Sequence, residues 1–152
     1  MKRAVLLPLV ALTACTSDLA MLDLGDPMPK DATATRSLVM VAPAQIWPKH
    51  KWISAGIEYA IAADSRGRVQ YIGTSSLQAR TPEGVRIGQP LKDVLNIQNL
   101  EVTLWPGWGY VAELPSGWKA ALFLDGHFLE REPLATDRVD LLFKGTLAGY
   151  GS

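Results

Sequence analysis

The chain has 152 residues, and its 15 lysines and arginines balance 15 aspartates and glutamates, which gives a formal net charge of zero at pH 7. This balance and the lack of a basic run argue against a nucleic-acid partner. The length suits one domain with a hydrophobic core and is too short for two comfortable ones.

The first residues have the layout of a secretory signal peptide. Lys2 and Arg3 precede an apolar run over residues 4–12, and the small residues Thr13 and Ala14 follow it. A basic end, a short apolar core and a small-residue site are read by the export machinery. The run is far shorter than the roughly 20 residues that span a bilayer as a helix. Residues 1–14 are therefore expected to be cleaved rather than to stay in a membrane.

The processing site resembles the bacterial lipobox, in which Leu and two small residues precede a lipidated Cys. Leu12, Thr13, Ala14 and Cys15 match all four positions. The resemblance implies cleavage before Cys15, a thioether-linked diacylglycerol on its sulfur and usually a third acyl chain on the new amino terminus. Two or three acyl chains anchor a protein stably, whereas one holds it marginally. The alternatives are an ordinary signal peptide with a chance cysteine, or a buried N-terminal helix.

Cys15 is the only cysteine in the chain, so no internal disulfide is expected. Lipidation would remove the reactive thiol that an exported protein would otherwise carry. In the lipobox family, Asp directly after the Cys favours retention in the inner membrane, and here that position is Thr16. The resemblance thus implies the outer membrane, with the domain facing the periplasm.

Residues 15–37 are predicted to form the lipidated Cys and a flexible tether. Gly25, Pro27 and Pro29, several acids and no sustained hydrophobic period favour this interpretation. In the alternative, the apolar residues of this stretch pack on the domain as a short segment. Those residues are Leu19, Met21, Leu22 and Leu24.

A single globular domain is predicted over residues 38–152, and its first elements are strands. Residues 38–41 form a short apolar run that ends at Pro43. Ile57, Tyr59 and Ile61 alternate with Glu58 and Ala60, residues 64–67 have turn composition, and alternation resumes over 68–72. This pattern predicts a β-hairpin.

The second half predicts one helix and a β-meander. Pro90 suits the first position of a short helix over residues 90–97, with apolar residues at helical spacing. Strands separated by Pro/Gly-rich or Asp-Gly turns are expected at 100–105, 110–114, 118–124 and 138–144. Short connections favour antiparallel pairing. The expected fold is α+β, an antiparallel sheet of a hairpin and a meander with one short helix packed on it.

A turn in the middle of the chain carries a second resemblance. The stretch Thr81-Pro82-Glu83-Gly84-Val85-Arg86-Ile87-Gly88, followed by Gly107-Trp108 and Gly117-Trp118, resembles a pattern of small uncharacterised proteobacterial lipoproteins over roughly residues 56–124. That family offers no activity to transfer. The layout around Gly88-Gln89-Pro90 is also weakly similar to outer-membrane assembly lipoproteins of the BamE/SmpA type and to β-lactamase-inhibitor proteins. Those proteins place helices before this turn, whereas a hairpin is expected here.

The turn has a structural interpretation in which Pro82 presets its geometry while Gly84 and Gly88 adopt positive φ. The alternative is that this loop binds a ligand.

No grouping in the sequence predicts catalysis. His50 and His127 are the only histidines and lack metal-ligand spacing, and Ser116 lies in a turn composition rather than a nucleophile elbow. No catalytic residue, no metal site and no cofactor other than the covalent lipid on Cys15 is expected. The alternative is an envelope hydrolase that uses His127 or His50 with an Asp.

Aromatic residues suggest a binding surface. The chain has five tryptophans, and Trp105, Trp108 and Tyr110 gather at a predicted hairpin tip. Such residues anchor protein partners or stack on sugar rings. The alternative is that the tryptophans fill the core.

These patterns together predict a lipid-anchored envelope lipoprotein that acts as a non-enzymatic binding or interaction module. Its expected contacts are the membrane, through the lipid, and an envelope protein or glycan. The alternatives are the envelope hydrolase and a purely structural envelope lipoprotein.

Overall fold

The computed structural model describes residues 17–19, 21–42, 45–97, 100–105, 108–124, 127–129 and 131–145. The expected signal peptide and Cys15 lie outside these residues. The elements are β1 (Ser17–Asp18), β2 (Thr33–Ala42), β3 (Gln45–Ser54), β4 (Ile57–Ala63), β5 (Val69–Thr74), β6 (Ala79–Arg80), α1 (Leu91–Leu95), β7 (Val102–Trp105), β8 (Gly109–Glu113), β9 (Lys119–Leu124), β10 (His127–Phe128) and β11 (Val139–Gly145).

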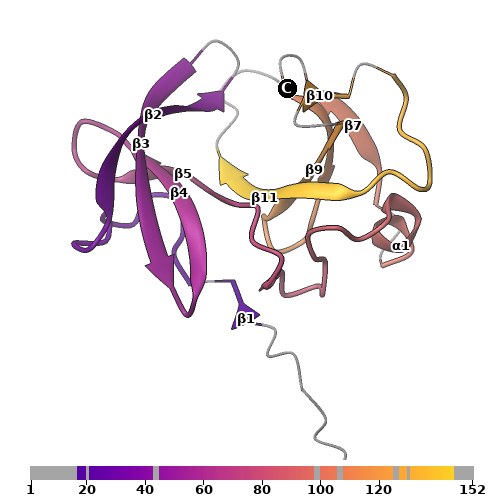
Figure 1. Cartoon of the computed structure of the whole chain (residues 1–152), viewed down its shortest axis with the longest axis horizontal. Helices are drawn as coiled ribbons and strands as arrows, with labels where there is room; N and C mark the ends of the chain where they lie inside the picture. The colour runs from indigo at the N-terminus through magenta and orange to yellow at the C-terminus, as the bar shows by residue number, and fades with distance from the viewer. Residues whose placement is uncertain are drawn as a thin grey trace, which may run out of the picture.

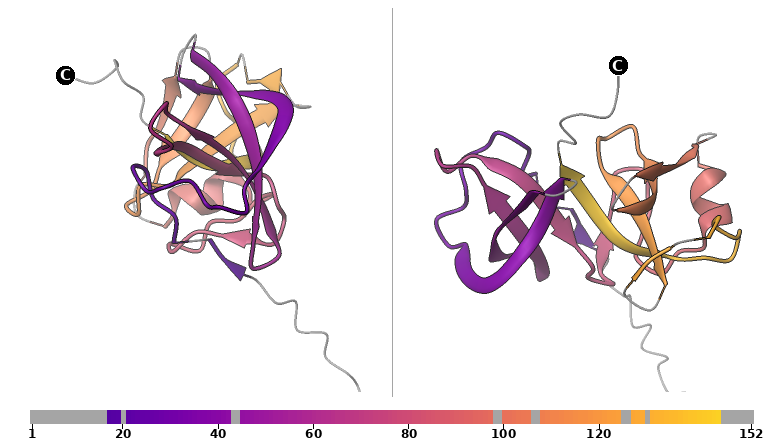
Figure 2. Two further views of the ribbon diagram at one scale, coloured as in Figure 1. Left: turned by 90° about the vertical axis from the view of Figure 1, so that its left-hand side faces the viewer. Right: turned by 90° about the horizontal axis from the view of Figure 1, so that it is seen from above.

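One antiparallel sheet contains most of the strands (Figure 1). Its path runs β2-β3-β4-β5-β11-β9-β8-β7, and β10 pairs with β9 beside that path. β1 and β6 form a separate parallel pair. Strand β11 joins the two halves, because it pairs with β5 on one side and with β9 on the other. Figure 2, seen from above, shows the two halves lying on either side of β11.

The predicted α+β fold is confirmed. The hairpin expected over residues 57–72 is β4 and β5, and the strands expected between residues 100 and 144 are β7, β8, β9 and β11. The Asp64 carboxylate accepts hydrogen bonds from the N–H groups of Arg66 and Arg68 in the hairpin turn, and Gly67 there has a φ of 72°. The helix is shorter than predicted, with Pro90 as its N-cap. Among the residues described, no helix has the length and apolar character needed to cross a membrane.

Strand β3 was not predicted, because Pro48 and the Lys49-His50-Lys51 run are unusual in a strand interior. Pro48 pairs with Leu38 of β2, whereas pairing between β3 and β4 begins only at His50. Pro48 therefore interrupts no hydrogen bond of the β3–β4 ladder. The missing N–H of Pro48 therefore costs nothing on the β4 side of this ten-residue strand.

The central strands of the sheet are buried on both faces. Alternate residues of β4 face opposite sides of the sheet. Tyr59 and Ile61 therefore belong to one hydrophobic cluster, and Ala60 and Ala62 belong to the other. The first cluster, the main core, lies between the sheet and α1, which contributes the buried residues of its inner face. The predicted packing of the helix on the sheet is therefore confirmed.

The second cluster, the aromatic core, lies on the opposite face. Its buried members are Val41, Ala62, Tyr71, Trp105, Trp108, Val111, Ala121 and Phe143. Val41 belongs to β2 and Trp105 to β7, the strands at opposite ends of the sheet's path. In Figure 1 both halves of the sheet rise beside β11, so the curvature of the sheet brings these distant strands to one cluster.

The stretch expected to be a tether is part of the domain from Ser17 onward. The Gly25 N–H donates to the Val69 carbonyl oxygen (2.7 Å), and the Met28 N–H donates to that of Gly67 (2.9 Å). An ion pair joins Asp23 to Lys144 of β11. Leu19, Leu22, Leu24 and Met28 pack in or against the main core, whereas Met21 is fully exposed.

The tether boundary at residue 37 is therefore wrong for the described residues, and the domain does not begin at residue 38. The alternative of a packed segment is observed, without Met21. The physical reason is that the exposed side of the main core needs an apolar cover, and these leucines provide it.

Gly73 is the position where the curved sheet is most sensitive to added volume. A Cβ on Gly73 would lie 2.8 Å from Cζ of Tyr71 and closer still to its hydroxyl oxygen, and the buried Tyr71 ring packs against both Trp108 and Phe143. Moving the ring aside would disturb its contacts with both aromatic neighbours. We expect Gly73→Ala to lower the free energy of unfolding by about 1–3 kcal/mol, measured by urea denaturation.

Gly145→Ala is the matched control, because a Cβ there would meet the same Tyr71 ring at an ordinary 3.5 Å. We expect a change of at most about 0.5 kcal/mol for this variant. Equal midpoints for Gly73→Ala and wild type would show that the tyrosine ring is not fixed by the aromatic core.

Candidate functional site

The tryptophans predicted as a binding surface are buried. Trp105 and Trp108 are 9% and 3% exposed. Trp108 stacks on Phe143 with ring centroids 4.6 Å apart, and Trp105 meets the same ring edge-on at 6.1 Å. The prediction of an exposed aromatic recognition surface is therefore wrong for these two residues. They fill the core, as the alternative had it.

Tyr110 lies on the other face of the sheet. It follows Gly109, the partner of Trp105, and strand alternation turns its side chain towards the main core, against which it packs half-buried. There it lines a hollow of about 480 Å³ between α1 and β7. The three aromatic residues do not share one surface, because adjacent strand positions face opposite sides of the sheet.

The indole N–H of Trp108 has an unusual environment. Its nitrogen is buried and has no hydrogen-bond partner among the described residues. The Lys119 ammonium lies 5.6 Å from the centre of the Trp105 ring at the border of the same core. Burial lowers the pKa of Lys119, and the charge of Glu113 opposes this effect. Burial also raises the pKa of the Tyr71 phenol, so this hydroxyl stays neutral.

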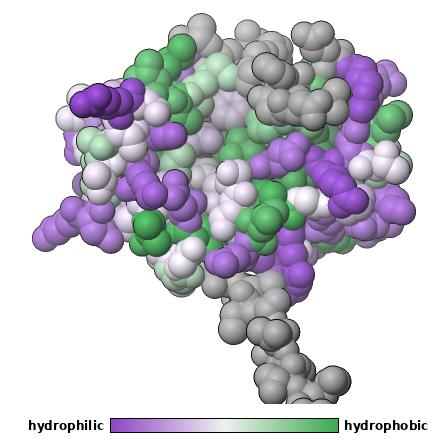
Figure 3. Space-filling view, in the orientation of Figure 1, coloured by the Kyte–Doolittle hydropathy of each residue, from purple (hydrophilic) through white to green (hydrophobic). Residues whose placement is uncertain are grey.

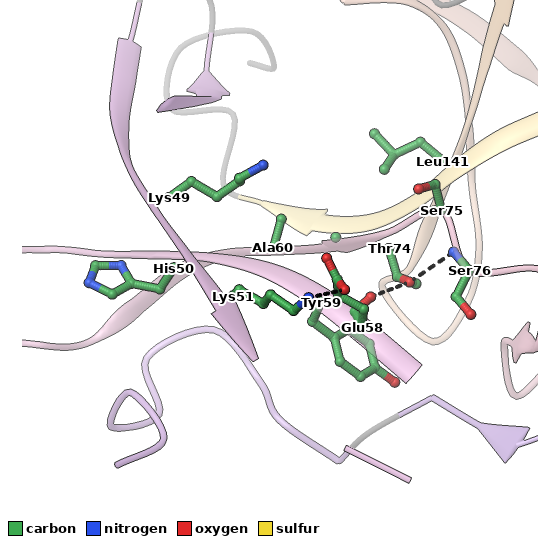
Figure 4. Close-up of a pocket in the computed structure, with 11 residues that line it drawn as sticks. Lys49, His50, Lys51, Glu58, Tyr59, Ala60, Thr74, Ser75, Ser76 and Leu141 are labelled. Atoms are coloured by element: carbon green, nitrogen blue, oxygen red, sulfur yellow. Dashed lines mark hydrogen bonds and ion pairs between the residues drawn. The ribbon is translucent and has the colours of Figure 1, made fainter. Parts of the chain in front are cut away.

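A cavity of about 380 Å³ lies over β3, β4 and β5 (Figure 4). Ala60 and Gly73 line its floor, and Leu141 of β11 borders it. The small floor residues leave the space that larger side chains would fill. The other lining residues are Lys49, His50, Lys51, Glu58, Tyr59, Thr74, Ser75 and Ser76.

Most polar groups around this cavity already have partners. Lys51 pairs with Glu58 at 2.5 Å. The Thr74 hydroxyl donates to the Glu58 carbonyl oxygen (2.7 Å) and accepts from the Ser76 N–H (3.1 Å). The Lys49 ammonium makes no ion pair or hydrogen bond with any residue that the structure describes. Figure 4 shows its amine extending over β4 towards Leu141.

The cavity thus offers the Lys49 ammonium, which has no partner among the described residues, and the serines of the β5–β6 connection, Ser75 and Ser76. An ammonium and hydroxyls suit a ligand with carboxylate, phosphate or sugar oxygens. The sequence interpretation missed this site because Lys49-His50-Lys51 reads as a solvated run. A strand prediction there would have placed Lys49 and Lys51 on one face.

The histidines are not brought together with a catalytic partner among the described side chains. His50 extends to the opposite side of β3 from Lys49 (Figure 4), and its Nδ1 is buried without a hydrogen-bond partner. His127 belongs to β10, and its side chain lies outside the description. No group of three His, Cys, Asp or Glu side chains within the described ranges could hold a metal ion.

The turn predicted around Gly84 and Gly88 has the positive φ values that its glycines suggested. Gly84 and Gly88 have φ values of 90° and 81°, a region that favours glycine. Thr81 is buried, and its hydroxyl accepts a hydrogen bond from the Val85 N–H (3.1 Å). The Gly88 N–H donates to the Val139 carbonyl oxygen (2.7 Å), which ties the turn to β11. Pro82 is exposed at its start, and the loop lines a shallow hollow of about 480 Å³.

Glu83 connects this turn to the β8–β9 turn. Its carboxylate accepts hydrogen bonds from the Ser116 N–H (2.6 Å) and from the Ser116 hydroxyl (2.9 Å). Burial raises the pKa of Glu83, but these hydrogen bonds outweigh it and hold the pKa below its ordinary value. The charged carboxylate therefore helps to fix two loops together.

Comparisons with family models, with curated proteins and with solved structures find no match for this chain. The resemblance of the turn to small lipoproteins and the weaker layout similarities therefore stay predictions.

The Glu83 contact predicts an acid-dependent loss of stability. Because its pKa is lower in the folded than in the unfolded chain, the stabilisation is complete above the unfolded value near 4.5 and declines as the pH falls through the folded value. We expect Glu83→Gln to flatten the decline of the urea midpoint below about pH 4.5.

Ser116→Ala removes the hydroxyl donor and keeps the backbone donor, so it should flatten the same decline only in part. If Glu83→Gln lost stability as steeply as wild type over this range, Glu83 would not be the group that links the two turns.

Proposed function

We propose that this protein is a bacterial envelope lipoprotein, anchored by lipid on Cys15, whose domain acts as a non-enzymatic binding module. The observation that carries the proposal is the sequence Leu12-Thr13-Ala14-Cys15 behind a short apolar run. Leu and two small residues before Cys are what the lipoprotein-processing enzymes recognise, and an apolar run of this length suits a signal peptide. Thr16 in place of Asp supports sorting to the outer membrane, with the domain in the periplasm.

The binding role is supported by the cavity over β3, β4 and β5. The Lys49 ammonium and the hydroxyls of Ser75 and Ser76 border a floor of Ala60 and Gly73. This combination suits an envelope protein or glycan that presents oxygen-rich groups at the cavity. The buried tryptophans take no part in such contacts.

A structural envelope lipoprotein is the second candidate. The burial of Trp105 and Trp108 favours it, because the residues most typical of recognition stabilise the core instead. A hydrolase gains no support from His50, whose Nδ1 has no described partner to orient the ring as a general base.

The anchor has a direct test. We expect Cys15→Ser to abolish incorporation of radiolabelled palmitate and to leave an unprocessed or soluble species, because the diacylglycerol is transferred to the cysteine sulfur. Cell fractionation and palmitate labelling measure both effects. Thr16→Asp is the matched control, since it keeps the lipid and should move the protein towards the inner membrane. Lipid labelling that survives in Cys15→Ser would show that the anchor assignment is wrong.

The binding role is tested by a photo-crosslinking amino acid at Ser75, which lines the cavity, in the lipidated protein. We expect a discrete crosslinked species from membranes, and we expect Lys49→Glu to remove it by reversing the charge at the cavity. The control is the same crosslinker at the exposed Ser65 in the β4–β5 turn. Crosslinking that is absent, or equal at both positions, would favour the structural lipoprotein.

A further inference from the structure

The first described segment of the chain, β1, is held on the domain by backbone pairing with β6. β1 lies parallel to β6, with Ser17 opposite Ala79 and Asp18 opposite Arg80. The Leu19 N–H donates to the Arg80 carbonyl oxygen (3.1 Å), and the Leu19 side chain is 8% exposed. The chain is therefore attached to the folded domain from Ser17 onward.

Only one residue, Thr16, then separates a lipidated Cys15 from the first residue of the domain, Ser17. Two residues extend by at most about 7 Å, so the Cα of Cys15 lies within that distance of the Cα of Ser17. This step depends on the proposed lipidation. An acylated Cys15 would hold the β1–β6 end of the domain at the bilayer surface, because the linker is too short for the domain to turn another side towards it.

This end of the domain exposes large apolar side chains. Met21 follows β1 and is 99% exposed, and Leu77 precedes β6 and is 77% exposed. Ile53, near the end of β3, is 56% exposed. They are among the seven large apolar residues that the described part of the chain leaves exposed.

The turn between β3 and β4 lies at the same end. A Cβ on Gly56 in this turn would be 3.8 Å from Oε1 of Gln78, the residue before β6. Both Figure 1 and the left view of Figure 2 place β1 and this turn at the lower end of the domain. Figure 3 shows apolar side chains exposed along that lower edge. We define Met21, Ile53 and Leu77 as the anchor face.

Two arginines lie beside β1 at this end of the domain, and the first, Arg80, stands opposite Asp18 in the β1–β6 pair. Arg80 and Arg86 pair through an isolated β-bridge, and Arg86 is exposed. Guanidinium groups near a bilayer surface are attracted to anionic lipid phosphates. Exposed apolar side chains next to basic ones are typical of surfaces that enter the boundary between headgroups and acyl chains.

We propose that the anchor face docks onto the bilayer that holds the Cys15 lipid, with Met21, Ile53 and Leu77 inserted at the headgroup boundary. The occupant of this face is the lipid surface, since the short link from Cys15 places that surface within reach. Docking fixes the orientation of the domain and turns β10 and the Ala42 and Gln45 ends of β2 and β3 away from the membrane, as Figure 1 shows.

The test uses the lipidated full chain with one added cysteine. Cys15 is the only native cysteine, and its sulfur is a thioether once lipidated, so an added cysteine is the only free thiol. An environment-sensitive fluorophore is attached to Leu77→Cys or Ile53→Cys, and the protein is reconstituted in phosphatidylethanolamine/phosphatidylglycerol vesicles. We expect blue-shifted emission and loss of intensity to a quencher dissolved in the bilayer.

Ile46→Cys is the matched control. Ile46 is equally apolar and 59% exposed, and it lies at the opposite end of β3 from Ile53. Its label should keep water-like emission and resist the bilayer quencher. A Leu77 label as exposed to water as the Ile46 label, on anchored protein, would overturn the docking.

Two further measurements separate this proposal from the anchor itself. Met21→Glu combined with Leu77→Glu should return an Ile53 label to water while the protein stays in the membrane, whereas Leu104→Glu on β7 should change nothing. An unchanged Ile53 label in the double variant would also overturn the docking. If the wild-type chain reacts with a thiol reagent and remains soluble, both the anchor and the docking are wrong.

Discussion

The pairing of β11 between β5 and β9 is the constraint on which the rest of the fold depends. Without it, the β2–β5 and β7–β9 halves would be separate sheets, each with exposed apolar faces. β11 is buried on both sides, since Leu142 belongs to the main core and Phe143 to the aromatic core. Phe143 contacts Tyr71 and both core tryptophans. One strand therefore joins the sheet and fills the space that its curvature encloses.

The two cores differ in what covers them. The main core is closed by α1, by the turn around Gly84 and Gly88, and by the segment that follows β1. The aromatic core is closed by the curvature of the sheet, which explains why it needs large, flat side chains. Gly73 and the small residues of β4 leave the room for those rings, and the space that remains beside them is the cavity next to Lys49. The small residues that make room for the aromatic core therefore also create the cavity.

The attachment of residues 17–28 changes how an anchored domain would behave. A long tether would let the domain sample many orientations and partners at a distance from the membrane. A chain that packs from Ser17 onward restricts the domain to the bilayer surface and gives it one preferred orientation. The proposed anchor, the apolar anchor face and the cavity are consistent with a module that presents a fixed side to the envelope.

The sequence by itself determined the elements whose signals are local. Alternation predicted the β4–β5 hairpin, and turn residues marked the strands β7, β8, β9 and β11. Pro90 marked the start of α1, and the glycines at 84 and 88 marked positive φ. The cavity was not predictable, because β3 forms part of its wall. The sequence did not predict β3, since Pro48 and the neighbouring lysines are unusual in a strand. Only the tertiary structure decided that Trp105 and Trp108 are buried, that leucines 19, 22 and 24 cover a core, and that β11 lies between two earlier strands. These outcomes depend on the register and curvature of strands far apart in the chain, and a local pattern carries no information about which distant surface will cover it.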